Sequence, residues 1–276
     1  LVPNMPMYKT RTGELTEWKG CAGPNAARNG FFAALLAQEG IAGPEAPFEG
    51  KFGLWDVVGK FSLPLEPGDP PKRIAYSNLK AFPICYQCQT AAWTALDVRD
   101  RFAATDVEKI IVETYHKSYL MTGSDPNRWA PKTRETADHS TPYVVATVLL
   151  QGDVGESAFS EEALNDPEVK ALMRRIEVIE NKDLTAIHPG CVPCRMTVML
   201  KDGSEIKHEL MHPKGHAKSP MTEQEINDKF RRLYADYGDA RNAVAVINAV
   251  EGLDTMADIA PLFATFRDGA KQLAAE

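Results

Sequence analysis

The sequence has fewer positive than negative charges and few cysteines, and both features exclude certain classes of function. Its 276 residues carry 31 Lys and Arg against 38 Asp and Glu, a formal net charge of −7. No basic tract stands out, so we do not expect nucleic-acid binding. No apolar run approaches the roughly 20 residues that span a membrane, so we expect no membrane partner. Five cysteines without a secretory signal indicate a reducing compartment, and we expect the cytoplasm.

Other familiar signatures are missing as well. The sequence contains no internal repeat, no glycine-rich phosphate loop and no Ser-His-Asp arrangement that can be placed. It also begins with LVPNMPMYKT, without an initiating Met, so we expect a processed chain or a part of a longer one. Apolar residues make up 44% and charged residues 25%, which is typical of a folded globular protein with one or two domains.

The first element that the sequence does contain is an alanine-rich helix. Pro24 suits its first turn and Gly40 its C-terminal stop, so the stretch GPNAARNGFFAALLAQEG predicts a helix over 24–39. Because its many small residues allow close approach of other helices, we expect this helix to be buried. A short helix follows near 51–60, and the proline-dense stretch 62–73 predicts a domain boundary.

The middle of the chain has the pattern of an α+β unit. QTAAWTALDVRDRFA (89–103) has helical periodicity, whereas the segments EKIIVETYH, RRIEVIEN, RMTVMLKDG and EIKHELMH alternate like strands. The last two flank a KDGS turn, which predicts a hairpin. Helices return near the end, at 241–250 and 257–274 and after the capping box of Thr222 and Glu225. We therefore expect a helical domain (1–70) that is interrupted by an inserted α+β domain (71–217) and resumes over 218–276.

Four of the five cysteines form two Cys-x-x-Cys pairs, in ICYQCQTAAW (Cys85 and Cys88) and HPGCVPCRM (Cys191 and Cys194). Two thiolate pairs could close around zinc or an iron–sulfur cluster. However, the pairs are about 100 residues apart, whereas compact zinc ribbons place theirs within about 15–20. The alternative is that they are small, apolar, partly buried residues. We favour this alternative and expect no metal.

Three longer stretches carry a resemblance. They are RWAPKTRETADHSTPYVVATVLLQGD (128–153), EWKGCAGPNAARNGFFAALLAQEGIAGPEAPFEG (17–50) and SNLKAFPICYQCQTA (77–91), and KHELMHPKGHAKSPMTEQEINDKF (207–230) adds to them. Together they resemble the MmgE/PrpD family, which includes 2-methylcitrate dehydratase, cis-aconitate decarboxylase and iminodisuccinate epimerase. The resemblance implies a large helical domain with an inserted α+β domain. Family members are usually longer, so the chain is similar to their C-terminal portion.

The resemblance also implies a set of site residues. Lys19 and Lys80 fall at two active-site lysines of the family, and His139 and Tyr143 at its His-Ser-x-x-Tyr pattern. Cys85 falls where some members have histidine and others glutamate. We expect Cys85 and Gln89 to bind the substrate, together with Arg134, which could join the lysines in a basic pocket for the carboxylates.

Gln89 falls where members have either histidine or glutamine, so Cys85 and Gln89 depart from the decarboxylase pattern. The glutamine and the form KTRETADHSTPYVVA favour the 2-methylcitrate dehydratase branch. The residue types suit this chemistry, because lysines bind carboxylates and a histidine can act as acid or base near neutral pH. Asp138 is a candidate N-cap for a helix that begins at STPY, with Pro142 in its first turn.

The expected function is therefore metal-independent dehydration of 2-methylcitrate, or of a similar tricarboxylate, to 2-methyl-cis-aconitate. The family implies no cofactor and a homodimer, and the alanine-rich helices need partners. Three alternatives stay open at this point. They are decarboxylation of cis-aconitate, epimerisation of an amino diacid, and a catalytically silent fragment or metal-stabilised binding module.

Overall fold

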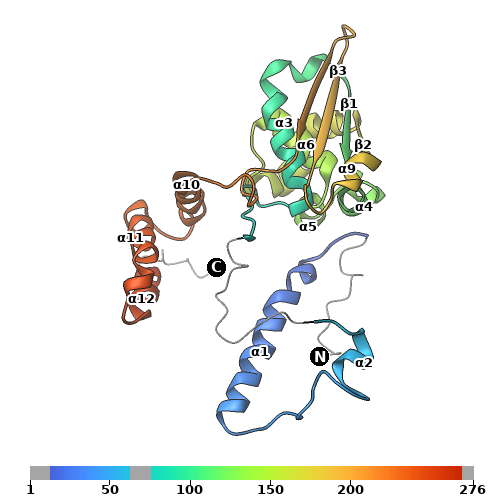
Figure 1. Ribbon diagram of the computed structural model, residues 1–276. Helices are drawn as coiled ribbons and strands as arrows, with labels where there is room; N and C mark the ends of the chain where they lie inside the picture. The colour runs from blue at the N-terminus through green and yellow to red at the C-terminus, as the bar shows by residue number, and fades with distance from the viewer. Residues whose placement is uncertain (1–12, 63–75, 269–276) are drawn as a thin grey trace. The chain divides into compact units, whose positions relative to one another are not determined.

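The computed structural model describes residues 13–62 and 76–268 (Figure 1). These residues divide into two compact units. The first unit contains 13–62, 76 and 83–211. The second contains 77–82 and 212–268. Helices and a four-stranded sheet are both present, so the described residues form an α+β structure, as the sequence predicts. The predicted boundary at 70/71 lies outside the described residues, and the domain limits and the insertion stay predictions.

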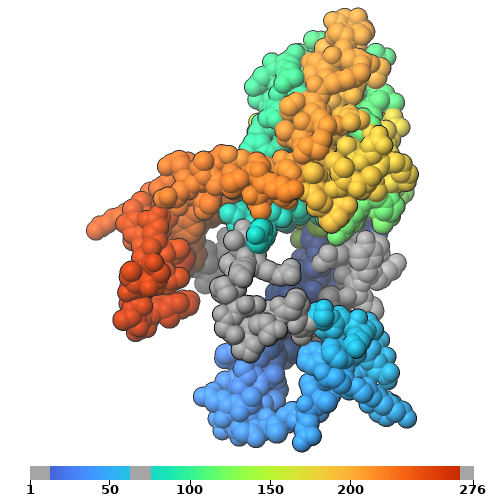
Figure 2. Space-filling view, viewed as in Figure 1, coloured from blue at the N-terminus to red at the C-terminus, as the bar shows by residue number. Residues whose placement is uncertain are grey.

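The first unit is built around a sheet with the strand order β2-β1-β3-β4. Strand β1 (Val107–Thr114) pairs in parallel with β2 (Ile176–Glu180) and antiparallel with β3 (Cys194–Leu200). Strand β4 (Glu205–Leu210) completes the hairpin with β3. All four strands were predicted from alternation. The hairpin turn is confirmed too, because Gly203 adopts φ +85° and the turn is exposed at the surface, in orange in Figure 2.

Helices α3 (Gln89–Val98) and α6 (Thr141–Gln151) form the core of this unit together with the sheet. Nine consecutive residues of α6, 141–149, are buried, which explains why its sequence is apolar all round. Around them lie the shorter helices α4 (His116–Thr122), α5 (Arg134–Ala137), α7 (Glu161–Leu164), α8 (Pro167–Met173) and α9 (Lys182–Ala186). The predicted helix 89–103 is therefore confirmed over 89–98, after which a 3₁₀ turn, η6 (Arg99–Arg101), follows.

The N-terminal segment contains η3 (Glu17–Gly20), α1 (Ala22–Gln38) and α2 (Leu54–Val58). The predicted helices are present, but the expected burial of the alanine-rich helix is wrong, because no residue of α1 is buried. Phe31 and Phe32 are 68% and 60% exposed. Alanine and glycine bring little apolar area to a contact, so this helix gains little from packing without a partner of larger side chains.

The second unit contains α10 (Glu223–Tyr234), α11 (Ala240–Glu251) and α12 (Ala260–Asp268). The predicted capping box is confirmed, since Thr222 Oγ1 accepts from the backbone N–H of Glu225 and the Glu225 carboxylate accepts from that of Thr222. The core of these helices consists of Tyr234, Ala243 and Val246, with Phe230 and Phe266 packed against it. The predicted last helix extends to 274, of which 269–274 lie outside the described residues.

Segment 77–82 belongs to this second unit through a close backbone contact. The N–H of Leu79 donates to the carbonyl of Gly215 at 2.8 Å. Gly215 has φ +92°, and a Cβ at this position would meet the Leu79 carbonyl oxygen at 2.2 Å. Only glycine therefore fits here. No helix within the described residues is both long enough and apolar enough to cross a membrane.

Candidate active site

His139 lies in a tight connection between two helices. Helix α5 is capped by Thr133, whose hydroxyl accepts from the Thr136 N–H, and α6 is capped by Ser140, whose hydroxyl accepts from the Tyr143 N–H. Asp138 and His139 are the two residues between these helices before the Ser140 cap. The expected N-cap role of Asp138 is therefore wrong, because serine one turn before Tyr143 takes that role and leaves the Asp138 carboxylate free for another partner.

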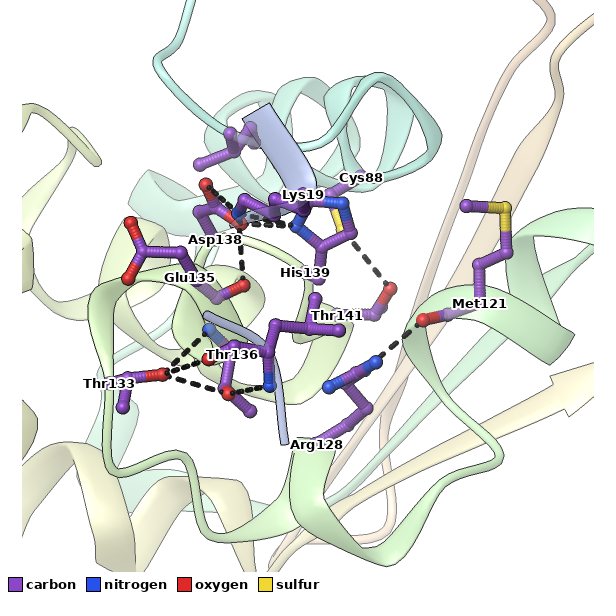
Figure 3. A network of polar contacts seen from close by, with 12 residues as sticks. Lys19, Cys88, Met121, Arg128, Thr133, Glu135, Thr136, Asp138, His139 and Thr141 are labelled. Atoms are coloured by element: carbon purple, nitrogen blue, oxygen red, sulfur yellow. Dashed lines mark hydrogen bonds and ion pairs between the residues drawn. The ribbon is translucent and has the colours of Figure 1, made fainter. Parts of the chain in front are cut away.

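That partner is Lys19 (Figure 3). Its ammonium lies 2.7 and 2.8 Å from the two carboxylate oxygens of Asp138 and 3.1 Å from the carbonyl oxygen of Glu135. It also lies 3.3 Å from Nδ1 of His139, and the same Nδ1 hydrogen-bonds the Asp138 carboxylate. Since one nitrogen cannot donate and accept at once, the contact with Asp138 requires Nδ1 to carry the proton. The three side chains are 14–17% exposed.

A clamp of hydrogen bonds brings Lys19 to this place. The Leu15 N–H donates to Thr136 Oγ1 at 3.0 Å, and Thr133 Oγ1 donates to the Leu15 carbonyl at 3.1 Å. The buried guanidinium of Arg128 donates to the carbonyl of Gly13 at 3.0 Å. Leu15 itself is 1% exposed. These hydrogen bonds fix the segment before η3 to the turns around α5. Lys19 lies in η3, directly after this segment.

Cys85 joins the same cluster from the other side. Its backbone N–H donates to the Asp138 carbonyl at 2.7 Å, and its thiol hydrogen-bonds both Cys88 and the imidazole of His139. Cys85 precedes the 3₁₀ turn η5 (Tyr86–Cys88), and Cys88 is the residue before α3. The structure therefore brings together three of the predicted site residues, Lys19, His139 and Cys85.

The charges of the cluster support one another. The hydrogen bond from Cys88, followed by that with His139, lowers the pKa of the Cys85 thiol well below its ordinary value although burial acts the other way. Burial also disfavours the imidazolium, but the Asp138 carboxylate and Cys85 raise the pKa of His139 above its ordinary value. Burial likewise opposes ionisation of Asp138, yet His139 and Lys19 keep its pKa below the ordinary one.

Gln89 lies close in sequence to this cluster and is 1% exposed. Its side-chain amide donates to the carbonyl of Ile84 at 3.4 Å, so it supports the turn that carries Cys85. Asp138 and Cys88 are the members of the cluster that sequence reasoning missed as site residues. The signal for Asp138 was its position beside His139, which was interpreted as a helix cap.

Two further predicted residues, Tyr143 and Arg134, line a separate cavity of about 920 Å³ together with Phe159, Lys132, Lys170 and Met173. The Tyr143 hydroxyl donates to the Ala158 carbonyl, and burial raises the pKa of this phenol. Arg134 forms an ion pair with Glu156 and lies 5.2 Å from the centre of the Phe159 ring. Its hydrogen bond to Glu156 raises the pKa of the guanidinium. Of the cations that line this cavity, Arg134 is therefore already paired.

Lys80 lies in the second unit and is exposed. Its backbone carbonyl accepts a hydrogen bond from the Lys229 ammonium. The roles predicted for Lys80, and for the other site residues, stay predictions.

The two cysteine pairs have different surroundings. All five cysteines are free thiols. Cys194 begins β3 and is 1% exposed, and burial raises its pKa to about 12. Among residues 13–62 and 76–268, no group of three or more His, Cys, Asp and Glu side chains is placed to hold a metal ion. The described residues therefore give the four-cysteine metal alternative no support.

The family is shown by matches of the sequence to two family models. Residues 82–255 match the MmgE/PrpD C-terminal domain, and residues 1–63 match the MmgE/PrpD N-terminal domain. The chain belongs to the MmgE/PrpD family.

Its curated relatives carry two kinds of name. The chain is 26% identical to a cis-aconitate decarboxylase of Homo sapiens over 253 residues, 86% of this chain and 50% of the relative. It is 25% identical to a 2-methylcitrate dehydratase of Salmonella typhimurium over 225 residues, 76% of this chain and 45% of the relative. A cis-aconitate decarboxylase of Mus musculus is 24% identical, over 86% of this chain and 50% of the relative. The chain spans about half the length of the curated relatives it matches.

Proposed function

We propose that the protein is a lyase that acts on a tricarboxylate without a metal ion, and that its reaction is the dehydration of 2-methylcitrate to 2-methyl-cis-aconitate. The observation that supports this is the cluster of Lys19, Asp138 and His139, in which a cation and a carboxylate hold an imidazole in one tautomer. The relatives named 2-methylcitrate dehydratase supply the reaction.

The cluster suits one of the two proton transfers of a dehydration, the protonation of the leaving hydroxide. The reaction removes a proton next to a carboxylate and expels a hydroxide, which must be protonated as it leaves. A raised pKa makes His139 protonated to a greater extent at a given pH, and the protonated imidazole can give its proton to the hydroxide. The Asp138 carboxylate then stabilises the imidazole tautomer that remains. The Lys19 ammonium stabilises the negative charge that develops on the substrate.

Decarboxylation of cis-aconitate is the second candidate. The cis-aconitate decarboxylases of Homo sapiens and Mus musculus match 86% of the chain and that of Aspergillus terreus 49%, whereas the 2-methylcitrate dehydratases of Salmonella typhimurium and Cupriavidus necator match 76% and 72%. Both reactions leave a carbanion-like charge beside a carboxylate, so Lys19 can stabilise the charge and His139 can donate a proton in either reaction. Epimerisation of an amino diacid and a catalytically silent chain are the remaining alternatives.

We further propose that the α+β unit is an insertion in a helical domain, as the family resemblance implies, and that the protein forms a homodimer in the cytoplasm. The exposed phenylalanines of α1, Phe31 and Phe32, support the dimer, because apolar side chains at this exposure favour a partner surface.

The experiment is proton NMR of the purified chain with 2-methylcitrate, citrate and cis-aconitate in turn. We expect the signal of the methyl group on the double bond of 2-methyl-cis-aconitate to grow only with the first. Product from cis-aconitate with loss of a carboxyl group would favour the second candidate. A folded chain that converts none of the three acids contradicts the proposal.

Two variants link the activity to the cluster. Lys19→Ala and His139→Gln should each lower the rate by at least about 100-fold, the usual contribution of a positioned proton-transfer group. The matched control is Lys109→Ala, which removes a lysine that pairs with Glu177 at 2.6 Å on the exposed side of the sheet. This control should keep the full rate.

A further inference from the structure

The proposed lyase reaction explains neither of the two Cys-x-x-Cys pairs. We propose that Cys85 and Cys88 form a thiol modification site for hydroperoxides, at which Cys85 is the attacking thiolate and Cys88 closes a disulfide onto it. This site lies inside the candidate active site, but its chemistry is independent of the lyase reaction.

The local backbone brings the two thiols together. Cys85 precedes the 3₁₀ turn η5, and the N–H of Cys88 donates to the Cys85 carbonyl at 2.9 Å, which closes the turn. Within this turn the Cys88 thiol hydrogen-bonds the Cys85 sulfur, which also accepts from the backbone N–H of Gln87. Cys88 then takes the N-cap position of α3, a helix of 10 residues.

A histidine and a carboxylate complete the activation of Cys85. The His139 imidazole hydrogen-bonds the Cys85 sulfur, and its Nδ1 hydrogen-bonds Asp138. Cysteine, histidine and aspartate in this order form a relay in which the imidazolium stabilises the thiolate. The pKa of Cys85 is accordingly below its ordinary value, first through Cys88 and then through His139. Thiolate rather than thiol is the form that reacts with peroxide.

Access and the resolving thiol also fit. Cys85 is 6% exposed, and the side chains of Lys19, Asp138 and His139 around it keep 14–17% of their surface in solvent. Cys88 is fully buried behind Cys85, and its sulfur lies 3.7 Å from Thr141 Oγ1. Burial and the neighbouring Cys85 raise the pKa of Cys88 well above its ordinary value. Cys88 therefore favours the neutral thiol form, which suits the resolving cysteine.

The reaction balances with a hydroperoxide as the oxidant. The Cys85 thiolate attacks one peroxide oxygen, the O–O bond breaks, and His139 gives a proton to the departing oxygen. This step leaves a sulfenic acid on Cys85 and one molecule of water or alcohol. The Cys88 sulfur then attacks the Cys85 sulfur, the S–O bond breaks, and the hydroxide leaves as water with the proton of the Cys88 thiol. Two thiols are oxidised and one peroxide is reduced.

The chain contains its own control in Cys191 and Cys194. This pair has the same spacing, but Cys194 lies in the sheet, where β3 pairs with both β1 and β4, and burial raises its pKa to about 12. Its thiol is near Thr94 rather than an imidazole. Spacing alone therefore predicts equal reactivity of the two pairs, whereas their surroundings predict that only the first reacts.

The test is peptide mass spectrometry of the full chain after a titration with hydrogen peroxide and alkylation of the remaining thiols. We expect a Cys85–Cys88 disulfide, seen as the loss of two hydrogen atoms, while Cys191 and Cys194 are alkylated. In Cys88→Ser, Cys85 should instead accumulate as a sulfenic acid that dimedone traps. In Cys194→Ser, the disulfide should form at the unchanged rate.

A second variant separates activation from mere proximity. His139→Gln should slow the formation of the disulfide by at least about 10-fold, since the imidazolium is absent, while circular dichroism shows a folded chain. The proposal is overturned if Cys191 or Cys194 is oxidised as fast as Cys85. It is also overturned if His139→Gln leaves the rate unchanged, or if Cys85 stays reduced at peroxide levels that oxidise Cys21. None of these readouts depends on lyase activity, so they stand whether or not 2-methylcitrate is converted.

Discussion

Helices α5 and α6 carry two regions with opposite properties. On one side, Lys19, Asp138, His139 and Cys85 form a cluster of mutually supporting charges with little exposed surface. On the other side, Arg134 and Tyr143 line a cavity of about 920 Å³, but the arginine is paired with Glu156 and the tyrosine hydroxyl with a backbone carbonyl. The cluster joins groups that can transfer a proton, whereas at the cavity the two predicted site residues already have partners. The two regions therefore differ in how many of their site residues remain in contact with other titratable groups.

The largest expected effect comes from removing the carboxylate of the cluster. Asp138→Asn should lower the free energy of unfolding by about 2–3 kcal/mol, because Lys19 and His139 both lose a charged acceptor while they are mostly buried. Urea denaturation at neutral pH measures this loss. The matched change in the cavity is Glu156→Gln, and an equal loss there would remove the difference between the two regions.

A smaller effect is the dependence of stability on pH. Because Asp138 and Cys85 raise the pKa of His139 in the folded protein, the histidine contributes stability that is complete below its ordinary pKa of about 6.5. This contribution is lost as the pH rises through the raised value. Wild type should therefore lose stability relative to His139→Gln over that window, in urea titrations at a series of pH values. A difference that stays constant with pH would mean that the imidazole is not held by its carboxylate.

In the cavity, the hydroxyl of Tyr143 is expected to matter more than its cation. Tyr143→Phe should cost about 1 kcal/mol of unfolding free energy, since the buried Ala158 carbonyl loses its donor. The same variant should keep most of the lyase rate if the cluster alone carries the chemistry. A rate loss as large as that of His139→Gln would show that the cavity is part of the active site.

The smallest effect is expected for Glu156→Gln itself. Arg134 and Glu156 are 43% and 46% exposed, and ion pairs at that exposure contribute about 0.5 kcal/mol or less. Thermal unfolding of the two variants side by side, Glu156→Gln and Asp138→Asn, measures the contrast directly. A destabilisation above about 1 kcal/mol by Glu156→Gln would contradict the expected difference between the exposed and the mostly buried ion pair.

Much of the fold could be predicted because it depends on local patterns. Strand β1 and the β3–β4 hairpin follow from alternation and an Asp202-Gly203 turn, and α10 follows from the capping box of Thr222. Local patterns do not decide burial. The alanine-rich α1 has the composition of a packed helix, yet it contains no buried residue.

The candidate site was harder to predict because its contacts are distant in sequence. Lys19 and Asp138 are 119 residues apart, and no periodicity predicts that they meet. The family pattern led to Lys19, His139 and Cys85 one at a time, but not to their mutual hydrogen bonds. Asp138 was interpreted as a helix cap, since a cap can be read from neighbouring residues and a distant lysine cannot.

The close contact at Gly215 has a consequence for Lys80. The Leu79 carbonyl lies where any side chain at position 215 would be, and Lys80 is the next residue along the chain. The position of Lys80, the lysine that the family pattern singles out, therefore depends on the absence of a side chain at Gly215. Gly215→Ala would place a methyl group against the Leu79 carbonyl oxygen and would therefore shift Lys80, although the lysine itself is unchanged.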